Sequence, residues 1–592
     1  MSTRRSPRRQ HQPRPLAPPA TSSRIWWRVA LLVVVGGAIY ANSVDGPFVF
    51  DDGVSIVTNS SIRAWSSRVL AAGREVPTAG RPLVNLSMAV NYALGGLAVR
   101  GYHLWNIGCH LLCAIVLLAA TRRALLHSRV PDWLRQSATN VALVIALIWV
   151  VHPLNSEVVD YLTERSESMM ALAFLITIYA SDRAMGSKRR RLWQAIGVAA
   201  CAAGMACKES MVTAPVAVVF YDATLVFGSL ARALRERWRY YGALATTWLI
   251  LIALLRTDAR IYSAGFSTGV SPWVYLLNQT IMLVRYLRLA AWPSGLVVNY
   301  GWPRALTLAE VLPYALVVVG CLGVAALALW RRPTLGVLGA WFFLTLAPTS
   351  SILPIATEVG AERRMYLPLI ALIALAVIGL AWAARQLARG PAIAATVAAV
   401  VVAALGATTM ARNREYASPL GLAETVLARW PTPSAEAAVG QELAVAGRHD
   451  EAIARLEEAA PHFARAYYHL GGELFNQGRI DEAVPALEQF VRLEPMLAEA
   501  VPARTMIGRA FMLQKRWPQA EEQLRLVLSM TTLGDRAHTT ALGFLADSLF
   551  ARQDFAAARS AYESYLQARP DDAGAVTNLA VSLSALGQLD QA

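Results

Sequence analysis

Residues 48–53, with the sequence FVFDDG, follow the first long apolar segment and place two adjacent carboxylates where the chain has just left a membrane. A carboxylate at a bilayer boundary is costly unless it has partners or a task. Adjacent side chains diverge, so Asp51 and Asp52 can point the same way only if the backbone turns, and Gly53 permits such a turn. One carboxylate could then act as a general base while the other positions it or holds a metal ion. A solvated pair that caps the next helix is the alternative.

The composition predicts a polytopic membrane protein. The chain has 592 residues, of which 55% are hydrophobic and only 16% are charged, and a soluble protein of this size is less apolar. The five cysteines lie in or beside apolar runs and have neither disulfide-framework nor zinc spacing.

The charge of the chain is unevenly distributed. Residues 413–592 carry 16 Arg and Lys against 23 Asp and Glu, a net charge of −7, whereas the remainder carries 39 against 17, a net charge of +22. The basic excess lies in short loops between apolar runs, which is the pattern of cytoplasmic loops in membrane proteins. This distribution argues against nucleic-acid binding.

The apolar runs predict about eleven spans, with the N-terminus inside and the C-terminus outside. Residues 1–24 are expected to be a disordered basic cytoplasmic tail, and residues 43–103 the first outer loop, in which 83–97 form an interfacial helix. Residues 272–291 are apolar but contain two arginines, and we expect them not to span, because a span there would place Arg331 and Arg332 outside. The predicted spans are 25–40, 104–120, 141–151, 169–180, 192–206, 212–227, 241–255, 311–330, 336–346, 365–384 and 392–410.

The tail contains an internal repeat. Residues 447–452 (GRHDEA) recur as 478–483 (GRIDEA) and, less well preserved, at 515–520, 552–558 and 586–592. The closing alanines are 31, 37, 38 and 34 residues apart. This period, with small residues where two helices touch, resembles tetratricopeptide repeats (TPR). The predicted fold is therefore all-α: a membrane helix bundle over residues 25–412 and a solenoid of helical hairpins over 413–592.

Three further outer segments carry polar residues. In the first, His152 stands at a predicted helix end, and Glu157, Tyr161, Glu164 and Arg165 follow at helical spacing, so a structural ion-pair network is an alternative to a functional role.

The second segment contains Lys208 and Glu209. Lys208 is one of only three lysines, and a fixed cation at the outer membrane face suits a lipid phosphate, although a snorkelling lysine is the plain alternative. The third segment, residues 362–368 (ERRMYLP), places Arg363 and Arg364 on the outer side, against the positive-inside pattern. Bidentate phosphate binding is the best reason for arginine there.

These residues form one constellation at one membrane face. Carboxylates (Asp51, Asp52) and phosphate-type cations (Lys208, Arg363, Arg364) occur together, while the sequence has no Gly-rich phosphate loop, Walker motif or Cys/His metal cluster. The chemistry indicated is group transfer from a lipid-linked phosphate donor, with an aspartate activating an acceptor hydroxyl.

Five segments in the same order resemble the transmembrane-and-TPR (TMTC-like) O-mannosyltransferase family and its bacterial relatives: 48–52, 101–106, 152–157, 208–209 and 362–368. The resemblance implies a GT-C glycosyltransferase fold and extracytoplasmic repeats that recruit the acceptor protein. It also implies transfer of mannose or a similar sugar from a polyprenyl-phosphate donor to a protein Ser or Thr hydroxyl, in a bacterial inner membrane.

By this resemblance Asp51 or Asp52 is the catalytic base, and Lys208, Arg363 and Arg364 face the donor phosphate. A divalent metal, Mg²⁺ or Mn²⁺, held by the two aspartates is a further expectation. The expected supporting residues are His152, Glu157, Arg165, Glu209, Glu362 and Tyr366. The competing interpretation is a non-enzymatic, membrane-anchored TPR scaffold for envelope assembly.

Overall fold

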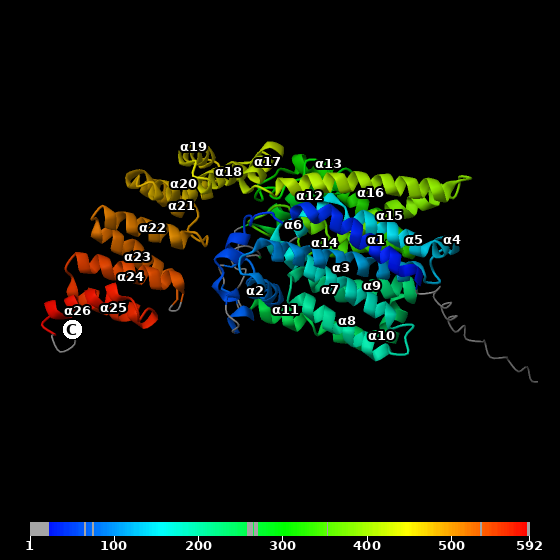
Figure 1. The fold of residues 1–592 in the computed structure, drawn as a ribbon, viewed down its shortest axis with the longest axis horizontal. Coiled ribbons are helices and arrows are strands. Elements are labelled where there is room, and N and C mark those ends of the chain that lie inside the picture. The colour runs from blue at the N-terminus through cyan, green and yellow to red at the C-terminus, as the bar shows by residue number, and fades with distance from the viewer. Residues whose placement is uncertain are drawn as a thin grey trace, which may run out of the picture. The chain divides into compact units, whose positions relative to one another are not determined.

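The computed structural model describes residues 23–63, 67–70, 72–73, 76–256, 265, 270–351, 353–532 and 535–588. The described residues form helices α1 to α26 and short 3-10 or π turns, and no strand element occurs among them (Figure 1). Residues 1–22 of the predicted basic tail and 589–592 of the last repeat lie outside the described residues.

The chain divides into two compact units. One consists of residues 1–298 and 303–418, and the other of 299–302 and 419–592, close to the predicted boundary at 412. The helices of the first unit are α1 Ser23–Tyr40, α2 Pro82–Gly95, α3 Val99–Leu125, α4 Asp132–Gln136, α5 Ala138–Val150, α6 Ser156–Asp160, α7 Arg165–Arg183, α8 Arg190–Met205, α9 Ala214–Tyr221, α10 Leu230–Ala245, α11 Trp248–Leu255, α12 Pro272–Ala291, α13 Leu308–Arg331, α14 Pro333–Leu346, α15 Pro368–Ala384 and α16 Gly390–Glu415.

The first unit is that of a multi-pass membrane protein. Among the described residues, six helical segments are long and apolar enough to cross a membrane: Ile25–Ser43, Val99–Leu125, Glu209–Val226, Leu230–Leu255, Leu308–Arg331 and Gly390–Glu415. Helix α5 and the segment Pro153–Asp160 make a seventh if this pair, bent by 57°, is one span. The other predicted spans fall on α7, α8, α14 and α15, which are shorter or less apolar, so the count of eleven stays a prediction. Helix α12, expected not to span, is not among the six.

The predicted interfacial helix forms as α2, but its polar side chains face the protein. Asn85, Ser87 and Asn91 are buried, and the Asn85 side chain bonds to those of Asn59 and Thr78 in the loop before the helix. The polar interruptions of this apolar stretch therefore serve the packing of the first outer loop, because a buried amide needs partners.

An aromatic contact joins the helices beneath the outer loops. The His110 Nδ1 atom of α3 lies 2.7 Å from the Tyr366 hydroxyl, and the Trp149 indole N–H of α5 donates to the Tyr366 carbonyl at 2.9 Å. These buried bonds fix the start of α15, and with it the residues just before it, relative to α3 and α5.

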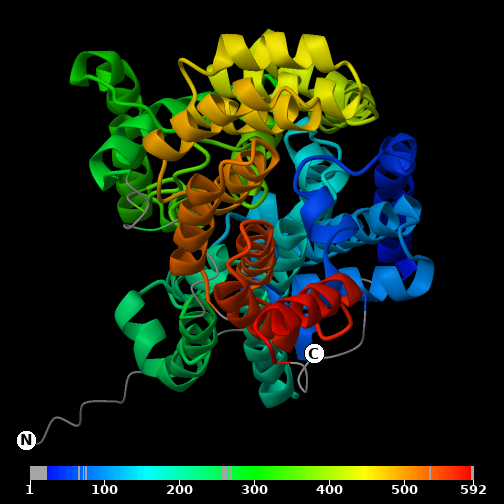
Figure 2. The same cartoon turned by 90° about the vertical axis from the view of Figure 1, so that its left-hand side faces the viewer.

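The second unit is the predicted stack of helical hairpins, which follow one another in chain order from yellow to red in Figure 2. The small residues of the repeat lie where the helices of one pair touch: a Cβ on Gly440, Gly471 or Gly508 would lie 2.5 to 3.0 Å from the leucine of the paired helix. The helices are α17 Pro419–Arg429, α18 Pro433–Val445, α19 His449–Ala459, α20 Ala464–Asn476, α21 Ile480–Leu493, α22 Ala500–Leu513, α23 Trp517–Met530, α24 Arg536–Ala551, α25 Phe555–Ala568 and α26 Ala573–Ala585.

Candidate functional site

The two adjacent aspartates have different surroundings. Asp52 is fully buried, and its Oδ1 accepts from the Thr163 N–H at 2.7 Å and from the Thr163 hydroxyl at 2.6 Å. Its Oδ2 accepts from the Val49 N–H at 3.1 Å. Burial raises the pKa of Asp52 to about 7, although these hydrogen bonds oppose the shift. Asp52 therefore ties the first outer loop to the segment after α6.

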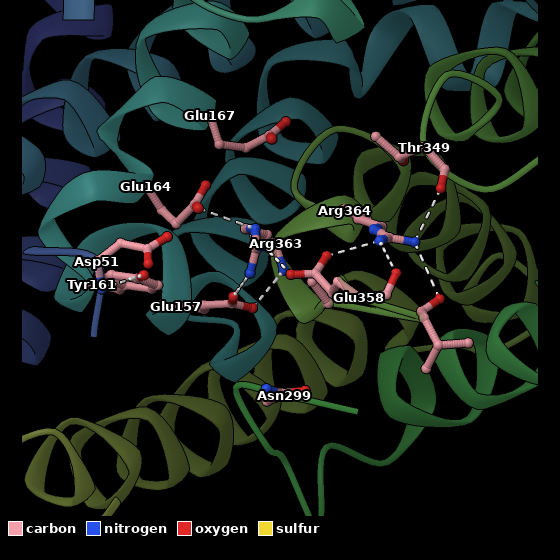
Figure 3. A network of polar contacts seen from close by, with 12 residues as sticks. Asp51, Glu157, Tyr161, Glu164, Glu167, Asn299, Thr349, Glu358, Arg363 and Arg364 are labelled. Atoms are coloured by element: carbon pink, nitrogen blue, oxygen red, sulfur yellow. Dashed lines mark hydrogen bonds and ion pairs between the residues drawn. The ribbon is translucent and has the colours of Figure 1, made fainter. Parts of the chain in front are cut away.

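Asp51 is exposed, and its N–H donates to the Tyr161 hydroxyl at 3.0 Å. Figure 3 shows Asp51 beside Tyr161 and near Glu164. The surrounding protein, which removes part of the water, and the negative charge of Glu164 raise the pKa of Asp51.

The backbone turn that separates these side chains is not at Gly53. Phe50 has a φ of 46°, whereas Gly53 starts a π-helical turn over Gly53–Val57. A phenylalanine in the left-handed region is strained, and such strain persists only where the surroundings enforce it. Here the Asp52 hydrogen bonds and the contact of the Phe50 ring with Tyr161 do so.

Arg363 lies among three carboxylates. Its backbone N–H donates to Glu157 Oε2 at 2.8 Å, and its guanidinium binds Glu157, Glu358 and Glu164, with Nε 3.2 Å from Glu164 Oε1 (Figure 3). The three acids raise the pKa of Arg363, although burial opposes the shift, so the guanidinium is held ionised in a fixed orientation.

Lys208 belongs to the same network. Its Nζ lies 3.2 Å from Glu164 Oε2 and 2.8 Å from Glu167 Oε2. Burial alone would raise the pKa of Glu164, but Arg363, Lys208 and Arg81 lower it to about 2. The structure thus brings together Asp51, Lys208 and Arg363, which the sequence placed in three separate loops.

Arg364 points away from this group, toward the loop before it. Its guanidinium donates to the Glu358 carboxylate at 2.8 Å, to the Tyr275 hydroxyl at 3.1 Å and to the Thr349 carbonyl at 3.0 Å (Figure 3). Its side chain is only 3% exposed. Arg364 therefore holds the loop that contains Glu358, while its neighbour Arg363 belongs to the same network as Lys208.

Three of the expected supporting residues make structural bonds. The His152 ring lies 3.2 Å from both the Leu154 N–H and the Ala290 carbonyl, and Tyr366 makes the aromatic contact beneath the loops. Glu362 accepts from the Val297 N–H.

Arg165 contacts α2, and Glu209 contacts the residue before this helix. Arg165 is buried and donates to Asn91 Oδ1 at 2.7 Å, with its guanidinium 5.5 Å from the Tyr102 ring. Glu209 lies 3.1 Å from the Arg81 guanidinium. These contacts hold α2 and the residue before it in place.

The aspartate pair does not suit a metal ion held jointly. The Asp52 oxygens already accept three hydrogen bonds, so the pair presents one available carboxylate, that of Asp51. In the part of the chain that the structure describes, no group of three or more His, Cys, Asp or Glu side chains converges as a metal site. Metal dependence itself stays a prediction.

Comparison with known proteins shows what the chain is similar to. Residues 132–256 match the family described as dolichyl-phosphate-mannose-protein mannosyltransferase, and residues 468–532 and 545–592 match the tetratricopeptide repeat. Protein O-mannosyl-transferase Tmtc2 of Drosophila melanogaster is 26% identical over 288 residues, covering 44% of this chain and 29% of that protein. Tmtc3 of the same organism is 23% identical over 564 residues, covering 82% and 56%. The chain is a homologue of the TMTC proteins.

Human TMTC4 is 27% identical to this chain over 210 residues, covering 32% of the chain and 28% of TMTC4. The chain thus spans under a third of TMTC4 and Tmtc2, and about half of Tmtc3. Among solved structures, Pseudomonas aeruginosa pilF is 20% identical with a TM-score of 0.26, covering 28% of this chain and 76% of pilF. The mannosyltransferase match includes Glu157, Glu164 and Lys208 and excludes Asp51 and Arg363.

Four residues of the network are not among the site residues that the sequence predicts: Tyr161, Glu164, Glu167 and Glu358. Glu358 binds both Arg363 and Arg364, and its signal was weak: a lone carboxylate five residues before an arginine pair in an outer loop. The sequence indicates Tyr161 and Glu164 only by their helical spacing, whereas the Tyr161 hydroxyl accepts from the Asp51 N–H and Glu164 binds both Lys208 and Arg363.

Proposed function

We propose that the chain is a membrane glycosyltransferase that moves mannose or a similar sugar from a polyprenyl-phosphate donor to a Ser or Thr hydroxyl of a protein. The observation that carries the proposal is the exposed residue Asp51 next to the network of Lys208 and Arg363. Homology to protein O-mannosyl-transferases supports the same reaction class.

Asp51 acts as the general base in this proposal. A Ser or Thr hydroxyl is a poor nucleophile, and a positioned carboxylate removes its proton as the new bond forms, which is worth about 10²–10⁴-fold in rate. Asp51 suits this role better than Asp52, whose oxygens accept hydrogen bonds inside the protein. Its raised pKa makes it a stronger base than an ordinary aspartate.

Arg363 and Lys208 stabilise the phosphate of the donor. A guanidinium has five N–H bonds and an ammonium has three. Three carboxylates bind the Arg363 guanidinium and two bind Lys208, so each cation retains donors for a further anion. The carboxylates fix both cations before the donor arrives, which lowers the reorganisation needed during transfer. The leaving group is already a phosphate and needs charge stabilisation more than protonation.

Arg364, the other residue predicted to bind the donor, positions Glu358 and Arg363 and does not itself bind the donor phosphate. Its bonds to the loop carbonyls hold Glu358, which in turn binds Arg363. Asp52 similarly holds the segment that carries Asp51.

The tetratricopeptide repeats recruit the acceptor protein. Their net charge of −7 over residues 413–592 suits extended or basic segments. The active face and the repeats then lie on the extracytoplasmic side of a bacterial inner membrane, in agreement with the basic loops at the other helix ends.

The deciding experiment compares Asp51→Asn and Asp45→Asn in a purified transfer assay with a polyprenyl-phosphate mannose donor and a Ser/Thr acceptor peptide. Asp45 is the matched control, because it is an exposed aspartate of the same loop that pairs with Arg100. Asp51→Asn should lower transfer by about 10²-fold or more with donor binding retained, and Asp45→Asn should leave it unchanged. Normal turnover of Asp51→Asn would refute the mechanism, and the absence of transfer by the wild type would favour the scaffold.

A further inference from the structure

The first unit contains an apolar cavity of about 490 Å³, within the usual range of ligand-binding pockets. It lies between α3, α4, α5, α7, α9, α14 and α15. Its walls are almost entirely hydrocarbon and include Leu117, Leu134, Leu338, Ala374 and the indoles of Trp133 and Trp382. All these helices belong to the first unit, whose apolar segments we expect to lie in the membrane.

The residues that line the cavity are buried at one end of α15 and exposed toward the other. Ile370 and Ala371, at the start of α15, are buried, whereas Leu375 and Trp382, further along the same helix, are 43% and 57% exposed. Helix α15 starts directly after the Arg363 network and its 17 residues rise about 25 Å. The open end of the cavity therefore lies far from the Arg363 network.

Two arginines stand at the open end. Arg332 lines the cavity, and the Arg385 guanidinium lies 4.8 Å from the ring of Trp133 in its wall. Both side chains are exposed, and among the described residues neither guanidinium makes a hydrogen bond or an ion pair. An apolar cavity with two cationic side chains at its open end is complementary to a molecule with a hydrocarbon chain and an anionic head group.

We propose that this cavity binds one acyl chain of an anionic phospholipid, whose phosphate contacts Arg332 and Arg385. The lipid comes from the leaflet at the arginine-rich helix ends, opposite the face of Asp51. The prenyl tail of a sugar donor would have to enter from the Arg363 side, where Ile370 and Ala371 close the cavity. The proposal does not depend on the glycosyltransferase activity.

Gly379 allows the cavity to be filled without disturbing the fold. It lines the cavity on α15, and a Cβ placed on it meets no atom within 4 Å. Gly379→Phe would therefore put a ring where the acyl chain lies. Gly323→Phe is the matched control, because Gly323 is also a helical glycine with open space around its Cβ, but on the exposed face of α13, away from the cavity.

Native mass spectrometry of the full chain in detergent measures the retained lipid, with dioleoyl-phosphatidylglycerol, dioleoyl-phosphatidylcholine and a polyprenyl phosphate as probes. We expect one retained phosphatidylglycerol and little phosphatidylcholine. Gly379→Phe should weaken retention by about fourfold for each methylene displaced, about tenfold or more in all, and Gly323→Phe should not. Arg332→Ala with Arg385→Ala should abolish the preference for phosphatidylglycerol, whereas Arg189→Ala, an exposed arginine outside the cavity, should preserve it.

Equal retention by Gly379→Phe and wild type would overturn the proposal, as would equal binding of the two phospholipids. Selective loss of polyprenyl phosphate in Gly379→Phe would assign the cavity to the donor tail instead and would also overturn it. Thermal unfolding of Gly379→Phe near the wild-type temperature excludes misfolding as the cause of lost lipid.

Discussion

Lys208 and Arg363, separated by 155 positions in the chain, share the carboxylate of Glu164: one oxygen lies 3.2 Å from Lys208 Nζ and the other 3.2 Å from Arg363 Nε. The two cations thereby hold a fixed separation without touching each other. This bridge also places a negative charge near Asp51, where it raises the pKa of that carboxyl. Glu164 therefore links the proposed phosphate-binding groups to the proposed base.

The first prediction concerns the pH dependence of transfer. Asp51 works as a base only when ionised, so the rate should fall on the acid side at a pH above the ordinary aspartate pKa of about 3.9. Glu164→Gln removes a negative charge that favours the protonated form of Asp51, so this acid limb should move to lower pH. Profiles of kcat/KM against pH for wild type, Glu164→Gln and the exposed control Glu236→Gln check the shift. An acid limb at the same pH in all three proteins would contradict it.

The second prediction concerns Thr163 and the stability of the outer loop. Thr163→Val keeps the shape of the side chain but removes the hydroxyl that donates to Asp52 at 2.6 Å. Because a buried acceptor then loses a partner, the free energy of unfolding should fall by about 1–3 kcal/mol. Thr163→Ser retains the hydroxyl and should lose less. The midpoint of thermal unfolding in detergent measures both, and equal losses would show that packing, not the hydrogen bond, matters here.

The third prediction uses the raised pKa of Asp52. The folded protein holds the proton up to about pH 7, whereas the unfolded chain releases it near pH 4. The unfolded state therefore binds fewer protons between these values, and the stability due to this group is full below pH 4 and declines until pH 7. Asp52→Asn has no carboxyl proton to release. The free energy of unfolding of the wild type, relative to that of the variant, should therefore fall as the pH rises from about 4 to about 7. A difference that does not change with pH would show that the carboxylate is ionised in the folded protein.

The repeat architecture could be predicted because each hairpin carries its own signals: small residues at the helix contact and a glycine in the turn. The sequence could only suggest that Asp51, Lys208 and Arg363 lie close together, since each of these residues is in a different loop. Sequence could not separate Arg363 from Arg364, because their roles depend on the position of Glu358 and Tyr275 in space. Nor could it show that the segment Asn299–Trp302 belongs to the second unit, where Trp302 lies 4.7 Å from the Arg465 guanidinium.

The fourth prediction concerns Glu358, which the sequence did not reveal. Glu358→Gln should loosen both arginines, because it weakens one ion pair of each guanidinium. We expect faster proteolysis of the loop over residues 353–361 and weaker binding of the polyprenyl-phosphate donor. Glu310→Gln, at an exposed carboxylate that caps α13, is the control. Unchanged proteolysis and donor binding in Glu358→Gln would mean that the Arg364 bonds to backbone carbonyls suffice to hold the loop.

The last prediction concerns the turns of the repeats. Each first helix ends in the same way, with the chain passing through the left-handed region: Gly447 and Gly478 have φ of 77° and 75°, and Lys515 and Gln553 at the equivalent positions have 57° and 67°. The hydrogen bonds are also the same, since the N–H after each of these residues donates to a carbonyl five positions earlier. The repeats at Lys515 and Gln553 thus make the same turn without glycine, the residue that adopts the left-handed conformation without strain.

A residue with a Cβ costs roughly 1–2 kcal/mol in this conformation, and the greater freedom of glycine in the unfolded chain offsets part of this. Lys515→Gly and Gln553→Gly should therefore each stabilise their hairpin by about 1 kcal/mol, which slows hydrogen exchange of the buried N–H groups in α22–α25 by about fivefold. Lys515→Ala keeps the Cβ and should give no gain, which separates the backbone effect from loss of the lysine charge. Gly447→Ala should speed exchange in α18 and α19, because its Cβ would meet open space and only the backbone would be strained. Equal effects of Lys515→Gly and Lys515→Ala would rule out the backbone as the source of the strain.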